Sequence, residues 1–174
     1  MTGSGTQPRP SVPVYQDGEH AISVCENAVL TYSSAAPNPR YLQAWQRTVE
    51  LVVGELQGPL LILTLIDRRA KAPDETSKRS IRATITRHAS HIDAFAYVVE
   101  GEGFGAAAMR SALSLISMAA RYPFPQKVFG RVEDAAPWML SRPTHGERRT
   151  PSVAQLVNSA HVLREYLRAV AAAG

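Results

Sequence analysis

The sequence predicts a single α/β domain in which helices back a small mixed β-sheet. Three observations lead to this fold class. Short β-prone runs alternate with segments of helical periodicity along the chain. The run 60–66 is almost continuously apolar, as is typical of a central strand covered on both faces. The length of 174 residues suits one domain that buries its own core without metals or disulfides.

The first predicted elements are a β-hairpin and a helix. The β-prone runs 20–25 and 28–33 are separated by a turn-compatible pair at hairpin spacing. Asn38 then offers a helix N-cap, and Pro39 suits the first helical turn. Apolar residues follow at steps of three and four until Gly58, and these are Leu42, Trp45, Val49, Val52 and Leu56.

A central strand and a cationic helix come next. The run 60–66 ends at Asp67 and is followed by a basic loop, 68–73. Asp74 can cap the following helix, which is cationic on one side and apolar on the other. Its apolar side carries Ile81, Ile85, His88 and Ile92. The segment 94–99 is predicted to be another strand.

Residues 101–105 are predicted to form a tight glycine-rich connection, and residues 104–122 a helix. This helix is rich in small residues, and apolar side chains lie nearly all round it. A helix that is apolar all round is typically buried. We therefore expect it to be the most buried helix of the domain.

The C-terminal third is predicted to hold a short strand, a short helix and a long amphipathic helix. The strand is 126–129, and the helix 132–140 has two acidic residues in its first turn, where they complement the positive helix end. The segment 152–155, Ser-Val-Ala-Gln, matches a capping box. The last helix carries one apolar stripe, formed by Val153, Leu156, Val157, Ala160, Leu163, Leu167 and Val170.

The resulting order is ββαβαβαβα with an extra C-terminal helix. Strands joined by helices are expected to be parallel because crossovers are right-handed, whereas the opening hairpin is antiparallel. We expect a flexible leader at 1–18, the α/β domain at 19–141, a linker at 142–151 and the C-terminal amphipathic helix at 152–174.

Composition and charge exclude several classes of protein. Cys25 is the only cysteine, so a disulfide framework and a multi-thiolate zinc site are excluded and a reducing compartment is favoured. The start of the chain lacks the apolar run of a signal peptide, and no stretch approaches the ~20 apolar residues that span a bilayer. The net charge of +4 is small and aromatics are only 7%, which disfavours nucleic acid as a partner. We expect a cytoplasmic protein.

Two segments of the chain resemble the STAS and SpoIIAA-like superfamily. One is a strand ending in Leu65-Ile66-Asp67. The other is the later segment 129–140, in which a short strand leads into a helix with a sequence pattern similar to acidic-Ala-x-x-Trp-Leu. The predicted element order is also similar to that of the superfamily. The resemblance covers about residues 20–141 and implies a STAS-like fold more than a function.

The resemblance also implies a regulatory switch. Superfamily members that antagonise anti-sigma factors are phosphorylated on a serine at the start of the helix after the central strand. The matching region here is 74–80, in which Ser77 is the implied site and Thr76 and Ser80 are alternatives. Free backbone amides and neighbouring cations would stabilise a phosphate there. The other interpretation is that Ser77 is only a polar residue of the first helical turn.

Three further groups of residues could carry chemistry, and each has a plainer interpretation. The glycines of 101–105 could approach a phosphate, but the full nucleotide-binding spacing is missing, which favours a plain turn. His88 and His91 could share a metal, but a third ligand is lacking and His88 fits the apolar side of its helix. Cys25 fits a small apolar residue better than a nucleophile. We therefore expect no catalytic residue, no metal and no cofactor.

The densest charge feature is a cationic surface on the loop after the central strand and on the helix that follows. We call it the basic face, and it consists of Arg68, Arg69, Lys71, Lys78, Arg79, Arg82 and Arg87. A solvated surface is the plain interpretation. The functional interpretation is contact with a protein partner that has an acidic surface, or with an anionic membrane surface.

These observations predict a non-catalytic protein-interaction or regulatory module, phospho-regulated and part of a bacterial regulatory or scaffolding assembly. The alternatives are a small-molecule or lipid-binding domain and, third, an enzyme of unknown reaction. The apolar stripe of the last helix is expected to be buried, either within the same chain or against a second subunit in a homodimer.

Overall fold

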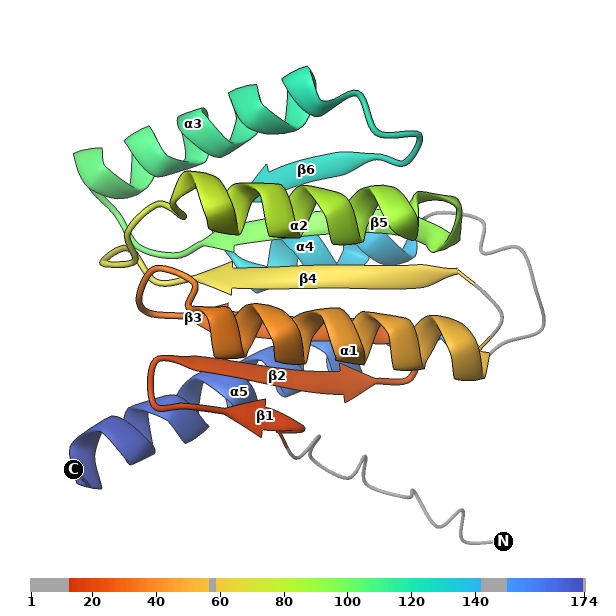
Figure 1. Cartoon of the computed structure of the whole chain (residues 1–174). Helices are drawn as coiled ribbons and strands as arrows, with labels where there is room; N and C mark the ends of the chain where they lie inside the picture. The colour runs from red at the N-terminus through yellow and green to blue at the C-terminus, as the bar shows by residue number, and fades with distance from the viewer. Residues whose placement is uncertain (1–12, 57–58, 142–149, 174) are drawn as a thin grey trace, which may run out of the picture.

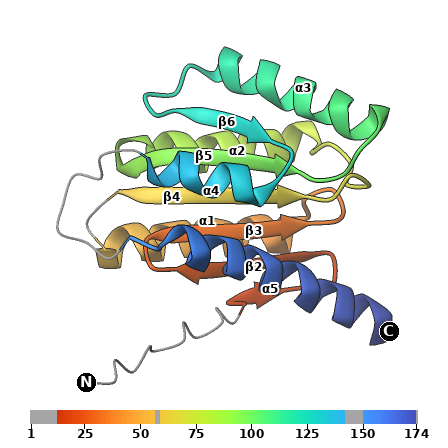
Figure 2. The same ribbon diagram turned by 180° about the vertical axis from the view of Figure 1, so that it is seen from behind.

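A six-stranded sheet separates two layers of helices in the computed structural model, which describes residues 13–56, 59–141 and 150–173. The strands are β1 (Tyr15–Gln16), β2 (His20–Cys25), β3 (Ala28–Ser33), β4 (Leu60–Ile66), β5 (Ile92–Val99) and β6 (Gln126–Phe129). The helices are α1 (Pro39–Leu56), α2 (Glu75–Arg87), the short 3₁₀ helix η1 (Ala89–His91), α3 (Phe104–Ala120), α4 (Val132–Leu140) and α5 (Val153–Ala173). Helices α1 and α2 cover one face of the sheet and α4 and α5 the other, as Figures 1 and 2 show.

The sheet is mixed, as the sequence predicts. Its strands lie in chain order from β1 to β6. Strands β1, β2 and β3 are antiparallel, and each pairing from β3 to β6 is parallel. Strand β4 lies inside the sheet, and its residues from Leu60 to Leu63 are at most 1% exposed. Parallel strands need cover on both faces, which explains the continuous apolar run.

Strand β1 corrects the prediction of a flexible leader over residues 1–18. Tyr15 pairs with Ile22, and Gln16 pairs with Ala21, so the last part of this segment extends the hairpin as a third strand. Two residues are too few to show an alternating pattern in the sequence. The rest of the predicted leader, residues 1–12, lies outside the described residues.

The apolar residues of the sheet alternate between two cores. On one face, Ile22 and Ile62 pack with α1 side chains such as Trp45. On the other face, Leu30 and Leu63 pack with residues of α4 and α5. This alternation is the period-two pattern of a strand. It makes the sheet the rigid centre from which the surface helices project.

Helix α5 packs against its own chain, which decides between the two predicted environments of its apolar stripe. Leu156, Leu163 and Leu167 are at most 3% exposed and belong to the core formed with β2, β3 and α4. The predicted capping box is present, because Ser152 and Gln155 exchange hydrogen bonds between side chain and backbone. Most of the stripe is therefore buried within the same chain, although Val153 at its start is 40% exposed. Most of the predicted linker, residues 142–149, lies outside the described residues.

The C-terminal end of α2 differs slightly from the prediction. The helix ends at Arg87, and His88 caps it. Ile92, which the helical pattern placed on the apolar side of α2, is instead the first residue of β5. The 3₁₀ turn between them breaks the helical period, and the apolar spacing alone does not reveal this turn.

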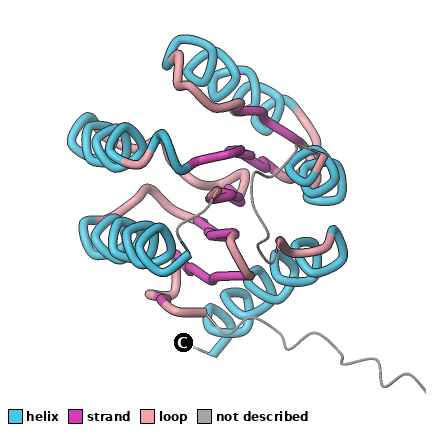
Figure 3. Tube along the Cα trace, turned by 90° about the vertical axis from the view of Figure 1, so that its right-hand side faces the viewer, coloured by secondary structure: helices cyan, strands magenta, loops and turns pink. Residues whose placement is uncertain are grey.

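Helix α3 corrects the prediction that it is the most buried helix. Only Ala106 among its residues is buried. The helix packs on β6 and β5 at the edge of the sheet, and no other described element covers its outer side (Figure 3). An apolar composition leads to burial only when another layer covers the helix, and the described residues provide no such layer over α3. Within the described segments, no helix, α3 included, is long and apolar enough to span a bilayer.

Candidate functional site

The outer side of α3 is the most unusual surface of the molecule. It consists of exposed residues that carry no charge, and we call this surface the α3 face: Phe104, Gly105, Ala107, Ala108, Ser111, Ala112, Leu115, Ile116, Met118 and Ala119. Its large side chains are far from buried, since Phe104 is 90%, Leu115 67%, Ile116 58% and Met118 76% exposed. A surface helix normally places charged residues toward water. Contiguous exposed apolar residues of this kind mark interaction surfaces.

Arg110, the one charged residue of α3, points away from the α3 face. Its Nη1 donates hydrogen bonds to the backbone carbonyls of Val99, at 2.9 Å, and Gly101, at 3.1 Å. These bonds fasten α3 to the end of β5. Because the cation is used in this way, it is absent from the outer side of the helix.

The glycine-rich connection before α3 serves as a turn. Gly101 and Gly103 have φ values of +106° and +95°, which only glycine adopts readily. A Cβ at Gly101 would also lie 3.4 Å from the side chain of Arg68, which lies over it. The turn presents Phe104 at the first position of the helix with its ring in solvent.

A hollow of about 450 Å³ lies between the C-terminal end of α3 and β6. We call it the β6 hollow, and its lining residues are Ser114, Ser117, Met118, Arg121, Tyr122, Phe124, Gln126, Lys127 and Val128. The rings of Tyr122 and Phe124 stack at 5.2 Å. Met118 belongs both to the α3 face and to this hollow, so the two surfaces are continuous.

The structure places all seven residues of the basic face on the surface. Three of its cations form ion pairs, since Arg69 contacts Asp67, Lys78 contacts Glu75 and Arg87 contacts Glu50. Arg79 donates a long hydrogen bond of 3.4 Å to Thr76. Among the described residues, the other four cations, Arg68, Lys71, Arg79 and Arg82, form no ion pair. The basic face is therefore exposed, as expected, and partly neutralised.

Ser77 lies in the first turn of α2, but its side chain is only 5% exposed. Its Oγ lies 3.5 Å from the carbonyl of Pro37, and its backbone N–H donates to Asp74 at 2.7 Å. A phosphate on Ser77 would be placed in a closed site next to a carboxylate. Thr76 is exposed and Ser80 is half-buried, so Thr76 is the more accessible of the three hydroxyls.

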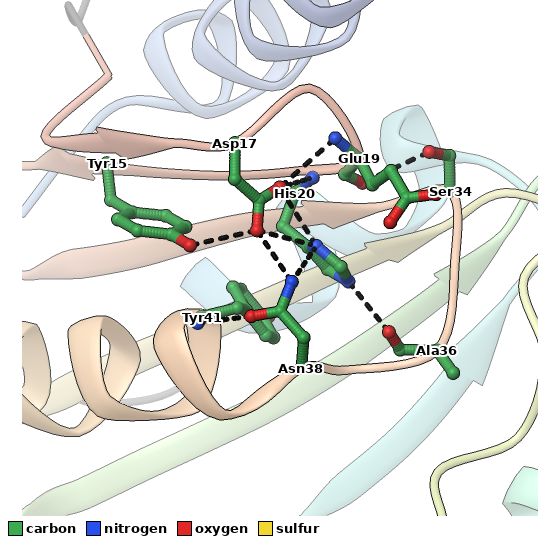
Figure 4. Close-up of polar contacts among 8 residues, drawn as sticks. All are labelled: Tyr15, Asp17, Glu19, His20, Ser34, Ala36, Asn38 and Tyr41. Carbon is green, nitrogen blue, oxygen red and sulfur yellow. Dashed lines mark hydrogen bonds and ion pairs between the residues drawn. The ribbon is translucent and has the colours of Figure 1, made fainter.

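A buried histidine cluster, which the sequence analysis did not identify, lies at the start of the sheet (Figure 4). His20 is 0% exposed; its Nδ1 lies 3.0 Å from Asp17 and its Nε2 lies 3.1 Å from the carbonyl of Ala36. Its ring stacks on Tyr41 at a centroid distance of 4.5 Å. Both ring nitrogens have partners and the ring has no access to solvent, so His20 joins segments of the chain.

Asp17 is the centre of the histidine cluster. Burial raises the pKa of its carboxyl, but hydrogen bonds from Asn38, from Tyr15 and from the backbone outweigh burial and lower this pKa to about 2. The carboxylate thus holds the β1–β2 turn against the start of α1. The only sequence signal for this cluster is a turn-forming Asp-Gly pair two residues before His20.

The remaining candidate groups do not come together. His88 is half-buried, and burial lowers its pKa; His91 is exposed on the following 3₁₀ turn. Within the described ranges, no group of three potential metal ligands is present. Cys25 is half-buried and burial raises the pKa of its thiol, which makes it a weak nucleophile.

Comparisons with known proteins identify the fold. No protein-family model and no curated protein matches the chain. Among solved structures, it is similar to an uncharacterized protein of the DUF3478 family with a SpoIIAA-like fold from Shewanella loihica PV-4. The TM-score is 0.54 and the identity 15%, over 70% of this chain and 94% of that chain. The chain therefore has a SpoIIAA-like fold, which confirms the predicted fold class.

Proposed function

We propose that this chain, with its SpoIIAA-like fold, is a non-catalytic module that binds a protein through the α3 face. The observation that carries the proposal is the complete absence of charge on the exposed side of α3. Each Å² of apolar surface removed from water contributes about 25 cal/mol. A partner that covers the four large side chains of this face gains that contribution directly.

The basic face supports binding in a different way. Exposed cations such as Arg79 and Arg82 raise the association rate with an acidic protein more than the final affinity. They lie on α2, which is the neighbour of α3 on the same side of the molecule (Figure 1). We propose that the partner combines an apolar contact with an acidic rim and belongs to a bacterial regulatory or scaffolding assembly. In this proposal, phosphorylation at the exposed Thr76 would reduce the positive charge of α2 and slow association.

Affinity capture from the source organism tests this proposal when each captured protein is identified and its binding is measured again with purified components. Leu115→Asp is expected to abolish binding, because it places a charge in the centre of the α3 face. Leu51→Asp is the matched control, since Leu51 is 56% exposed on α1 and lies outside the face. Equal binding by both variants would refute the role of the α3 face.

A charge reversal tests the basic face separately. The double variant Arg79→Glu, Arg82→Glu is expected to lower the association rate and to reduce its dependence on salt, while the dissociation rate changes little. An unchanged association rate would remove the basic face from the proposal.

A small-molecule or lipid-binding domain is the second candidate, and the β6 hollow favours it. Its volume of about 450 Å³ lies within the range of small-ligand sites, and Met118, Tyr122 and Phe124 supply the apolar part of a lining that also contains serines, Arg121 and Lys127. Extraction of the purified protein followed by mass spectrometry would reveal a bound ligand. A ligand that is lost in Tyr122→Asp would support this function.

A further inference from the structure

The apolar residues of α3 follow the spacing of a helix-pairing seam. Phe104, Ala108, Ser111, Leu115 and Met118 recur at alternating steps of four and three, and all five are exposed. This is the a/d spacing that brings two helices together along a straight seam.

The sizes of these side chains are complementary in an antiparallel pair. When two copies of α3 pair antiparallel about the middle of the helix, Ser111 of one copy faces Leu115 of the other and Ala108 faces Met118, while Phe104 lies beside the C-terminal end of the other helix. Each small residue then lies opposite a large one. Small residues let helix backbones approach closely, and the large ones fill the space that remains. The arrangement is the same for both copies, as a two-fold interface requires.

The β6 hollow provides a place for the most exposed side chain of the face. Phe104 is 90% exposed at one end of α3, and the hollow lies at the other end, beside Tyr122. In the antiparallel register, Phe104 of each copy meets the rim of the hollow on the other copy. A projecting aromatic side chain with a matching hollow is the usual form of an interface hot spot.

Charge agrees with a second copy as the occupant, and the length of α3 bears on the geometry of the pair. The α3 face carries no charge, so no like charges oppose each other within the pair of helices. A 17-residue helix is about 25 Å long. An ordinary interface buries about 800 Å² on each partner, which favours pairing over the full length of the helix rather than at one crossing point.

We propose that the α3 face binds a second copy of this chain in an antiparallel α3–α3 dimer, with Phe104 of each copy at the β6 hollow of the other. This inference rests on the proposed function, because it names the occupant of the same surface. It assigns the acidic partner to the basic face alone, so the two surfaces bind different occupants.

Sedimentation of the full chain over a range of protein concentrations tests the dimer. The wild type is expected to dimerise, and added salt is expected to leave the dimer intact or to strengthen it by screening the net charge of +4 on each copy. Leu115→Asp is expected to raise the dimer dissociation constant at least about 30-fold, and the control Leu51→Asp to leave it unchanged. Circular dichroism confirms that both variants fold. A wild type that stays monomeric, or a dimer that Leu115→Asp does not weaken, overturns the inference.

Cross-linking tests the register. In a Cys25→Ser background, Ala108→Cys with Met118→Cys is expected to give a disulfide-linked dimer. The two positions lie about 15 Å apart on one helix, too far for a bond within one chain. The pair Ala108→Cys with Leu51→Cys is the control and is expected to remain uncross-linked. Equal cross-linking in both pairs contradicts this register. Suppose that the wild type is monomeric and binds a different, identified protein, and that Leu115→Asp abolishes this binding. This outcome would refute the dimer and support the proposed function.

Discussion

The carboxylate of Asp17 lies 3.0 Å from Nδ1 of His20, a side chain without any exposure to solvent. Nε2–H of the same ring donates to the backbone carbonyl of Ala36, in the segment before α1, so one buried imidazole connects the β1–β2 turn to the β3–α1 connection. A buried polar group is costly when it loses its partner. The short strand β1, with only two residues, therefore depends on this contact for its position.

Removal of the carboxylate is expected to destabilise the protein. Asp17→Ala leaves the buried ring of His20 without its acidic partner, and we expect a loss of about 2 kcal/mol in the free energy of unfolding. Tyr15→Phe is the milder control, because it removes only the hydrogen bond from the Tyr15 hydroxyl to Asp17. Urea unfolding of the three proteins measures the difference. An equal loss in both variants would mean that His20 does not require the carboxylate.

The lowered pKa of Asp17 also predicts how the stability of the protein depends on pH. Its pKa in the folded protein is about 2, below the ordinary value of 3.8. A lowered pKa contributes stability that is fully present above about pH 4 and is lost as the pH falls toward about 2. Asp17→Asn is therefore expected to flatten the decline in stability over this interval. Urea unfolding at several acidic pH values measures the slope, and parallel curves for both proteins would contradict this assignment.

The parts of the fold that local sequence determines were predictable. The capping box at Ser152 and Gln155 and the cap of α2 at Asp74 involve residues three apart, and both are present as predicted. The central strand was equally clear, because its burial on both faces leaves a continuous apolar run.

The parts that depend on distant contacts were not predictable in the same way. The partners of His20 include Ala36, sixteen residues away, and no periodic pattern joins them. The prediction that α3 is buried was wrong, because a sequence shows that a helix is apolar but does not show whether another layer covers it. The face that carries the proposed function is thus the one that violates the expected pattern.

The buried position of Ser77 makes a negative charge there costly. We expect Ser77→Asp to lower the free energy of unfolding by more than about 2 kcal/mol, because it buries a carboxylate beside Asp74. Thr76→Asp is expected to change stability little, since Thr76 is exposed at the positive end of α2. Thermal unfolding compares the two variants. Phosphorylated Ser77 in fully folded native protein, detected by mass spectrometry, would contradict the closed site described for this residue.

Arg110 is expected to hold α3 in place. Its Nη1 bonds the carbonyls of both Val99 and Gly101, so Arg110→Ala leaves two acceptors at the end of β5 without this donor. We expect faster hydrogen exchange throughout α3, with exchange in β3 and β4 unchanged, because the core on either side of the sheet does not depend on this contact. Equal rates of hydrogen exchange of α3 in the wild type and the variant would show that packing on β6 alone positions the helix.

Two leucines, one on α5 and one on α3, are expected to respond very differently to the same substitution. Leu163 of α5 is 0% exposed and Leu115 of α3 is 67% exposed. Leu163→Ala removes a buried side chain and leaves a cavity, so we expect a loss of about 2–5 kcal/mol in the free energy of unfolding. Leu115→Ala is expected to change the stability of the monomer by less than about 0.5 kcal/mol. Urea unfolding at low protein concentration measures the monomer alone. The comparison separates two kinds of apolar helix surface in this chain. The stripe of α5 is buried in the core of its own domain, whereas the large apolar residues of α3 are exposed to solvent.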